Sequence, residues 1–328
     1  MLPSFFKNLG PISIDQIKQS INCDIRNISK NKIFNELVGT KNTTEKSLTF
    51  LYDSEKPEKK FTENTFLICT EKKYKHFNNK SQKALIVNNV QEAVAKLSNL
   101  FYRDYNRDEI SEFDDAKFGK NCILGENSIV ENGSIIGNDV IIESGTYIGH
   151  NCIIGDKTKI EQNTVITNSI IGQNVRIGRN CSIGQSGFGF FLKNDQNIDI
   201  FHVGIVIIKS FVSIGAGCAI DRGNFDDTII GENSYFDNLC HIAHNVQIGR
   251  NSAFAAMSGI AGSTKIGNNV LAGGQVGIAG HLCIGDNVQI AAKSGVFNDL
   301  DDKQTVMGNP AINKYNYIKA YKKTYGKK

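Results

Sequence analysis

Three of the six histidines fall in or soon after one polar stretch of the chain, at His241, His244 and His281. An imidazole is the side chain best suited to take up a proton near neutral pH. Gly262 follows His244 by 18 residues and carries a backbone N–H with no side chain beside it. A general base next to such an N–H suits acyl transfer, because the base activates the nucleophile while the N–H binds the oxyanion. This chemistry depends on whether 18 residues complete one turn of the fold.

A six-residue repeat from Phe118 to Val296 answers that question. Every sixth residue is large and apolar, with Ala272 the one small exception and three shifts in register. Such fixed-period similarity predicts a solenoid, here a parallel β-helix in which each hexad is a short strand and a corner. Three hexads, or 18 residues, then make one triangular coil, and we expect about nine coils stacked about 4.8 Å apart.

The coil places the candidate residues at one edge of the prism. His244 comes two residues after Ile242, so we expect it at an outward corner, with Gly262 one coil above. His281 is expected two coils above and one position along. Five cysteines take the small inward position of their hexads, where free thiols rather than disulfides are expected: Cys122, Cys152, Cys181, Cys218 and Cys240.

The limits of the repeat divide the chain into three predicted domains. Residues 1–104 lack the repeat and are predicted to form an α/β domain. Residues 105–307 are predicted to form the β-helix, and residues 308–328 a basic, tyrosine-rich helical extension. This last helix either packs on the end of the solenoid or offers a surface patch to an acidic carrier.

Within the first domain, the pattern predicts strands over 48–52, 65–69 and 84–87 and a helix after Asn89. The net charge of +4 is too small and too dispersed to indicate nucleic acid as a partner. No apolar run has the length of a membrane span or of a secretory signal, so we expect a cytoplasmic protein.

Several motifs in the second half of the chain occur together. They are Gly187-Phe188-Gly189-Phe190, Ile220-Asp221-Arg222-Gly223, Asp226-Asp227-Thr228-Ile229-Ile230-Gly231, Asp237-Asn238, His241-Ile242-Ala243-His244-Asn245-Val246, Gly259-Ile260-Ala261-Gly262-Ser263 and Gly308-Asn309-Pro310-Ala311. This set resembles the UDP-3-O-acylglucosamine N-acyltransferases of lipid A biosynthesis, a family of hexapeptide-repeat acyltransferases. The resemblance is close over residues 170–311 and implies a left-handed β-helix preceded by a uridine-binding domain.

The resemblance also implies a reaction, in which a 3-hydroxyacyl group passes from acyl carrier protein to the 2-amine of UDP-3-O-(3-hydroxyacyl)-glucosamine. His244 would be the general base and Gly262 the oxyanion donor, while His281 would assist at the acyl-donor and sugar site. Further substrate contacts are expected at Phe50, Asp237, Asn238, His241 and Asn245.

One prism has few places to enclose a sugar nucleotide and a long acyl chain, so we expect a C3 homotrimer with three equivalent active sites between subunits, as the resemblance also implies. We expect neither a metal nor a permanently bound cofactor, since phosphopantetheine arrives on the acyl carrier protein. The acyl chain is expected in a groove lined by apolar residues such as Met257 and Val276.

Two segments depart from the family pattern. In the uracil-binding segment Phe50 is retained, but Asp53 and Lys56 stand where the family has Asn and Tyr. The segment over 200–206 lacks the family's Gln and Arg, and His202 either fills that role or is an ordinary loop histidine.

Three other functions remain open. The first is a zinc enzyme of the γ-carbonic anhydrase type, with His241 and His244 as a ligand pair. The second is another nucleotide-sugar or amino-sugar acyltransferase that uses acetyl-CoA. The third is a binding or scaffold protein without catalytic activity, because a fold alone implies no reaction.

Overall fold

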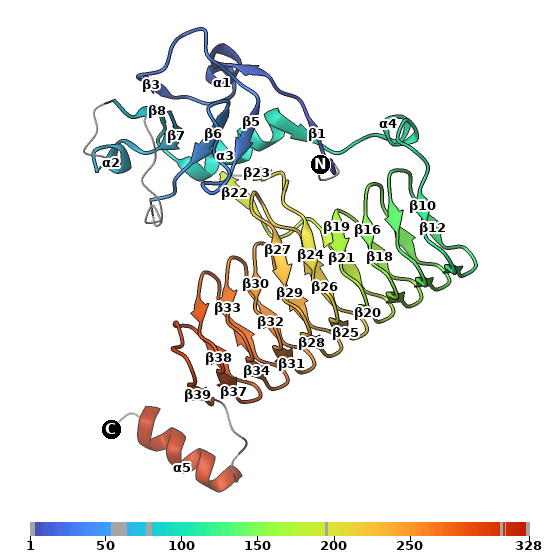
Figure 1. Ribbon diagram of the computed structural model, residues 1–328. Coiled ribbons are helices and arrows are strands. Elements are labelled where there is room, and N and C mark those ends of the chain that lie inside the picture. The colour runs from blue at the N-terminus through green and yellow to red at the C-terminus, as the bar shows by residue number, and fades with distance from the viewer. Residues whose placement is uncertain are drawn as a thin grey trace.

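The computed structural model describes residues 4–53, 64–76, 81–193, 196–308, 311 and 313–325. Its main body is a three-sided prism whose walls are parallel sheets of nine, ten and nine strands (Figure 1). An α/β unit formed by the N-terminal residues lies against one side of this prism, and a short helix follows at the C-terminal end. The predicted fold class, a mainly β left-handed parallel β-helix of hexapeptide repeats, is therefore confirmed.

The three walls take one strand each from every coil. The first wall contains β10 (Lys117–Phe118), β13 (Ile135–Ile136), β16 (Ile153–Ile154), β19 (Ser169–Ile171), β24 (Val206–Ile208), β27 (Thr228–Ile230), β30 (Gln247–Ile248), β33 (Lys265–Ile266) and β36 (Cys283–Ile284). The second contains β11 (Ile123–Leu124), β14 (Ile141–Ile142), β17 (Lys159–Ile160), β20 (Arg176–Ile177), β25 (Ser213–Ile214), β28 (Tyr235–Phe236), β31 (Ala253–Phe254), β34 (Leu271–Ala272), β37 (Gln289–Ile290) and β39 (Thr305–Val306). The third contains β12 (Ile129–Val130), β15 (Tyr147–Ile148), β18 (Val165–Ile166), β21 (Ser182–Gln185), β26 (Ala219–Asp221), β29 (His241–Ile242), β32 (Gly259–Ile260), β35 (Gly277–Ile278) and β38 (Gly295–Val296).

The second residue of most two-residue strands faces the prism axis and fills its core. Ile242 and Ile260, for example, are paired on consecutive coils and are both buried. On the second wall Phe236 and Phe254 stack with parallel rings at 5.3 Å, and the small residue Ala272 follows them on the next coil. Stacked apolar side chains along one axis give each coil a contact with the coil above and the coil below.

Most corners contain one residue in the left-handed region of φ, three positions after the inward apolar residue. Asparagine is common there, because it tolerates this conformation better than other side chains. Asn245 (φ 61°), Ser263 (φ 62°) and His281 (φ 62°) occupy this position on three coils of the same edge. The repeat itself therefore fixes the backbone that carries the candidate residues.

The N-terminal unit is built around a five-stranded sheet. Its strands in spatial order are β3 (Asp24–Arg26), β8 (Lys83–Ile86), β7 (Phe66–Cys69), β6 (Ser47–Phe50) and β5 (Glu36–Val38). Two small pairs accompany it, namely β1 (Lys7–Asn8) with β9 (Tyr102–Arg103) and β2 (Ile12–Ser13) with β4 (Ile33–Phe34). The helices are α1 (Ile14–Ser20), α2 (Glu71–Tyr74), α3 (Val90–Phe101) and α4 (Arg107–Ser111).

The predicted strands and helix of this unit are confirmed as β6, β7, β8 and α3. Asn89 caps α3 as expected, since its side chain accepts the N–H of Glu92 at 3.0 Å. The domain limits at residues 104 and 307 stay a prediction.

A hairpin inserted between two coils contacts the N-terminal unit. It consists of β22 (Phe190–Lys193) and β23 (Gln196–Asp199), and α3 packs against both strands (Figure 1). A second contact is the ion pair between Lys41 and Asp226, whose atoms lie 3.1 Å apart. The N-terminal unit therefore sits over the coils that lead to His244.

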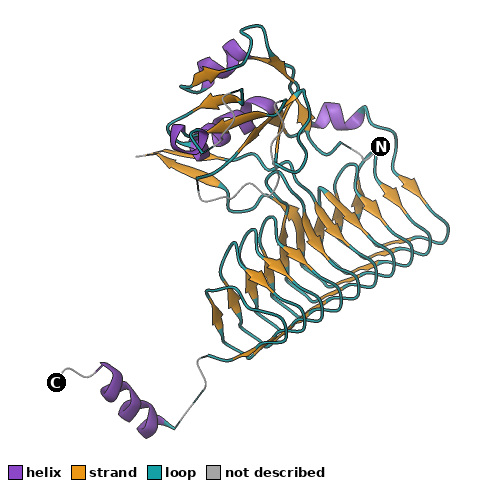
Figure 2. Ribbon diagram, turned by 60° about the vertical axis from the view of Figure 1, so that its left-hand side comes forward, coloured by secondary structure: helices purple, strands orange, loops and turns teal. Residues whose placement is uncertain are grey.

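The helix α5 (Lys314–Tyr325) stands apart from the prism in both views (Figures 1 and 2). It does not pack on the end of the solenoid, which was one of the two expected arrangements. Asn309 and Pro310 of the terminal motif lie outside the described residues, as does Lys56. None of the helices within the described ranges has the length and apolar character needed to cross a bilayer.

Candidate active site

His244 and Gly262 lie on consecutive coils at the same corner of the prism. His244 follows β29 and Gly262 follows β32, and the N–H of Ser263 donates to the carbonyl of His244 at 2.9 Å. A Cβ placed on Gly262 would lie 2.6 Å from both Cε1 and Nε2 of His244. The 18-residue spacing thus brings the glycine against the imidazole as predicted, and a side chain at position 262 would have to displace the His244 ring.

The backbone N–H of Gly262 has no hydrogen-bond acceptor among the described residues. Its carbonyl, in contrast, accepts the N–H of His281 on the next coil at 3.0 Å. A buried or half-buried N–H is normally paired. An unpaired N–H beside an imidazole is a candidate donor for an oxyanion.

Asn245 fixes the tautomer of His244. Its Nδ2 donates to the Asp226 carbonyl at 2.7 Å, and its Oδ1 accepts the N–H of Asn224 at 3.1 Å, so both ends of the amide are assigned by their partners. Nδ1 of His244 lies 2.9 Å from the same Oδ1 and must therefore carry the hydrogen. Nε2 keeps its unshared electron pair on the side of Gly262, which is the form that a general base requires.

A loop of the inserted segment covers His244. A Cβ placed on Gly187 would lie 2.7 Å from Cβ of His244, so this loop approaches the side chain closely. The ring of His202 lies edge-on to the ring of His244, with centroids 5.7 Å apart. His244 is consequently half-buried and not at an open corner, because the insertion between β21 and β24 folds back over it.

His241 points away from this cluster on the outer face of the third wall. Its Nε2 lies 3.1 Å from Oδ2 of the buried Asp221, and this hydrogen bond raises the pKa of His241. Asp221 also accepts Nε2 of Gln185 at 2.7 Å, and Gln185 accepts the hydroxyl of Ser182 at 2.8 Å. This chain of hydrogen bonds orients an exposed imidazole that can carry a positive charge.

His281 lies at the same edge as His244, one coil beyond Gly262, and its side chain is exposed. Asp237 and Asn238 occupy a different edge, at the corner that follows β28. There Asn238 Oδ1 accepts the N–H of Ala216 at 2.8 Å, and Asp237 accepts the side-chain amide of Asn238 at 2.8 Å. Within one chain His244, Asn245, Gly262 and His281 therefore lie on one edge of the prism, and Asp237 and Asn238 lie on another.

Phe50 lies in the N-terminal unit, and only 7% of its surface is exposed. Its ring packs against Tyr52 at 5.3 Å and against Phe225 at 4.8 Å. Phe225 precedes Asp226, the residue whose carbonyl holds Asn245. Phe50 thus stands near the loop that supports His244, while its expected contact with uracil stays a prediction.

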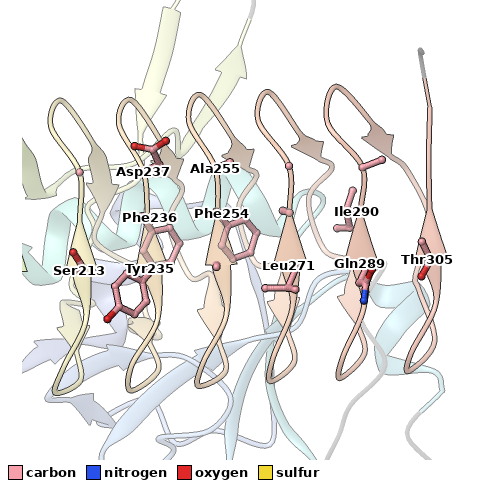
Figure 3. Close-up of a pocket in the computed structure, with 15 residues that line it drawn as sticks. Ser213, Tyr235, Phe236, Asp237, Phe254, Ala255, Leu271, Gln289, Ile290 and Thr305 are labelled. Atoms are coloured by element: carbon pink, nitrogen blue, oxygen red, sulfur yellow. The ribbon is translucent and has the colours of Figure 1, made fainter. Parts of the chain in front are cut away.

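Two hollows lie near the edge that carries Asp237. The larger, about 710 Å³, extends along the second wall past Tyr235, Leu271 and Gln289 (Figure 3). The smaller, about 510 Å³, is lined by Met257, Gln275 and Lys293 among others. Met257 thus lines a hollow as expected, but Val276 is buried in the prism core and lines neither, because it occupies the small inward position of its hexad.

The two histidines proposed as a zinc pair have separate partners, since His241 bonds Asp221 and His244 bonds Asn245. The described residues contain no group of three or more His, Cys, Asp or Glu side chains placed to hold a metal ion. All eight cysteines are free thiols, and those at the inward hexad positions are buried except for the half-buried Cys122.

Sequence reasoning missed most of the residues around His244. Gly187 approaches His244, and Asn224 and Asp226 hold its partner Asn245, all three from inserted segments where the six-residue register is lost. Gly187 and Asp226 each belong to a motif of the resemblance, which was the available signal, whereas Asn224 belongs to none. Asp221 was also part of a motif, but nothing in its spacing connected it with His241.

Comparison with protein families finds a match over the part of the chain that contains the candidate site. The family described as "Bacterial transferase hexapeptide (six repeats)" matches residues 227–262, which include His244 and Gly262, and "GMPPB C-terminal domain" matches residues 113–198. The UDP-3-O-acylglucosamine N-acyltransferase of Maricaulis maris is 49% identical over 80 residues, which are 24% of this chain and 23% of that protein. UDP-3-O-acylglucosamine N-acyltransferase 1 of Nitrobacter winogradskyi is 45% identical over 84 residues, or 25% of this chain and 23% of that protein.

The resemblance drawn from the motifs is confirmed over these stretches, which span about a quarter of the length of the curated relatives. Among solved structures, the UDP-N-acetylglucosamine acyltransferase from Campylobacter jejuni is 22% identical with a TM-score of 0.48, covering 65% of this chain and 86% of that one. The UDP-N-acetylglucosamine O-acyltransferase of Moraxella catarrhalis is 25% identical with a TM-score of 0.45, covering 62% and 76%.

Proposed function

We propose that this protein is an N-acyltransferase that moves a 3-hydroxyacyl group from acyl carrier protein to the 2-amine of UDP-3-O-(3-hydroxyacyl)-glucosamine, giving UDP-2,3-diacylglucosamine in lipid A biosynthesis. The observation that carries the proposal is the pairing of His244 with Gly262, in which a proton-accepting Nε2 faces a glycine whose N–H is unpaired among the described residues. Relatives named UDP-3-O-acylglucosamine N-acyltransferase, at 45–49% identity over 80 to 84 residues, support the choice of substrate.

The proposed step joins the amine nitrogen to the thioester carbon. Nε2 of His244 takes one amine proton as the C–N bond forms, and the Gly262 N–H donates to the oxygen of the tetrahedral intermediate. The C–S bond then breaks, and the proton on His244 passes to the sulfur of the departing phosphopantetheine thiol. General-base catalysis of this kind typically contributes about 10²- to 10⁴-fold to the rate.

We also propose that the enzyme is a C3 homotrimer with active sites between protomers. Support comes from the position of His244 and Asp237 on two different edges of one prism. In a ring of parallel prisms, the edge that carries His244 in one protomer can face the edge that carries Asp237 and both hollows in its neighbour. The hollow near Met257 would then offer apolar surface to an acyl chain.

The N-terminal unit, proposed as residues 1–104, would bind the nucleotide and thereby present the glucosamine to His244. The ion pair of Lys41 with Asp226 and the contact of Phe50 with Phe225 support this arrangement, because both connect the unit to the loop that holds Asn245. Exposed lysines near the C-terminal end, such as Lys314 and Lys319, would suit docking of the acidic carrier protein.

The test is an assay of the purified protein with UDP-3-O-acylglucosamine and a series of 3-hydroxyacyl carrier proteins, with acyl-CoA thioesters in parallel. We expect turnover with one or more of the carrier proteins and much less with acetyl-CoA. Absence of turnover with every carrier-protein chain length would contradict the proposal, and preference for acetyl-CoA would favour a different amino-sugar acyltransferase.

A further inference from the structure

His202 is a second histidine buried at the candidate site. Its side chain is only 1% exposed, and its ring meets the ring of His244 edge-on, with centroids 5.7 Å apart and planes at 78°. A Cβ placed on Gly189 would lie 2.6 Å from Cε1 of His202. The loop therefore closes over this ring only because position 189 has no side chain.

The hydrogen bonds of His202 fix its tautomer. Nδ1 lies 2.8 Å from the carbonyl oxygen of Ile200, an atom that can only accept, so Nδ1 carries the hydrogen. Nε2 then keeps an unshared electron pair and has no hydrogen-bond partner among the described residues. A buried acceptor without a partner is uncommon in a folded protein.

The surroundings of His202 keep its ring neutral. The pKa of His202 is lowered to about 4, mainly by burial and also by the nearby His244 and Arg222, against the opposing effects of the Ile200 carbonyl and of Asp221. The backbone is also anchored, because Arg222 Nε donates to the His202 carbonyl at 3.1 Å and Nη1 donates to the Gly184 carbonyl at 3.1 Å. The ring of His202 is thus enclosed, and its aromatic contact is with His244.

We propose that His202 is a positioning residue for His244: its buried, neutral ring packs edge-on against the imidazole of His244 and holds it in place without adding a second positive charge. The inference rests on the proposed function, in which His244 becomes an imidazolium after taking the amine proton. A second histidine with the ordinary pKa of about 6.5 would compete for that proton and repel the charge. An apolar side chain in place of this polar ring would disfavour the charged form of His244, because apolar surroundings lower the pKa of a histidine.

Histidine NMR tests this inference without substrate. Spectra of ¹⁵N-histidine protein are recorded from pH 5 to pH 8 for wild type, His202→Leu, His202→Gln and the control His150→Gln. We expect His202 to stay neutral with hydrogen on Nδ1 throughout this range. The His244 signal should titrate at lower pH in His202→Leu. It should titrate close to wild type in His202→Gln, because the glutamine side chain is also polar and neutral. In the control His150→Gln the titration should not change.

Kinetics on the full-length protein supply the second measurement. We expect His202→Leu to lower kcat about 10-fold with little change in KM and to move the acid limb of the pH–rate profile to lower pH. His202→Gln should recover most of kcat, whereas His150→Gln, which alters a half-buried histidine bonded to the Phe5 carbonyl, should leave it unchanged. Gly189→Ala displaces the His202 ring from outside and should shift the His244 titration in the same direction as the leucine variant.

Two outcomes would overturn the inference. One is an unchanged His244 titration in both His202→Leu and Gly189→Ala. The other is an equal loss of kcat in His202→Leu and His202→Gln with no shift in the acid limb of the pH–rate profile, which would mark a purely structural role. If His202→Leu fails to fold, Gly189→Ala and His202→Gln decide the matter. A wild-type protein without turnover refutes the proposed function alone, since the NMR titration still reports the coupling of the two rings.

Discussion

A Cβ on Gly262 would lie 2.6 Å from Nε2 of His244, well inside the contact distance of a methyl group and a ring nitrogen. The space at this position is therefore limited by the imidazole of the preceding coil and not by the backbone, since Gly262 is not among the residues with positive φ. Because position 262 has no side chain, the N–H of Gly262 stays accessible, and this is the N–H assigned to the oxyanion.

We expect Gly262→Ala to fold and to lower kcat at least 100-fold, because the methyl group displaces the His244 ring and blocks the approach to the N–H. Steady-state kinetics with circular dichroism on the same sample check this. Gly259→Ala is the matched control, because a Cβ there meets no atom within 4 Å. Wild-type kcat in Gly262→Ala would contradict the role given to this position.

Asn245 is predicted to set the basic form of His244. Asn245→Asp keeps an oxygen for Nδ1–H but adds a negative charge, so the acid limb of the pH–rate profile should move to higher pH. Asn245→Ala removes the acceptor and should lower kcat about 10- to 100-fold. It should also lower stability by about 1–2 kcal/mol, because alanine is disfavoured at φ 61°. Identical pH profiles in all three proteins would show that this contact does not govern His244.

The ion pair of His241 with Asp221 is predicted to make stability depend on pH. Its hydrogen bond raises the pKa of His241, so the stabilisation is complete below the unfolded pKa of about 6.5 and is lost as the pH rises through the folded pKa. About half of the His241 side chain is exposed, so we expect less than about 1 kcal/mol. Urea unfolding of wild type and His241→Gln at several pH values measures the effect, and a difference that stays constant from pH 5 to pH 9 would contradict it.

Phe254 supports the prism beneath the larger hollow (Figure 3). It is 2% exposed and stacks on Phe236. The small side chain of Ala272 occupies the same position on the next coil. Phe254→Ala should lower the free energy of unfolding by about 3–5 kcal/mol. Urea unfolding measures this loss, and the exposed corner variant Glu232→Ala should change stability by no more than about 0.5 kcal/mol. Equal stabilities would mean that the aromatic stack is not part of the core.

The parts of this protein that follow the six-residue repeat could be predicted from the sequence. The stacking of Gly262 on His244 follows from spacing alone, since one uninterrupted coil of 18 residues separates them. His202, Asn224 and Asp226 could not be placed this way, because insertions before β24 and β27 break the register and the loops return by routes that no period describes. The partner of His241 was missed for a similar reason. Asp221 and His241 lie on neighbouring coils, but the insertion between them makes their separation in sequence differ from the 18-residue spacing.

Predictions about surfaces depended on which way a side chain points. Val276 was assigned to a groove although its hexad position directs it inward, and the mutual packing of Phe50 with Phe225 depends on how two units meet. The N-terminal strands β6, β7 and β8 were recognised because each is a compact apolar run, whereas short pairs such as β1 with β9 carry no such pattern.

The most direct test of the account is the single-turnover rate of His244→Ala with UDP-3-O-acylglucosamine and its 3-hydroxyacyl carrier protein. We predict a rate about 10²- to 10⁴-fold below wild type, with the same circular dichroism spectrum and the same unfolding midpoint to within a few degrees. A folded His244→Ala protein that transfers the acyl group at the wild-type rate would contradict the assignment of this histidine as the base.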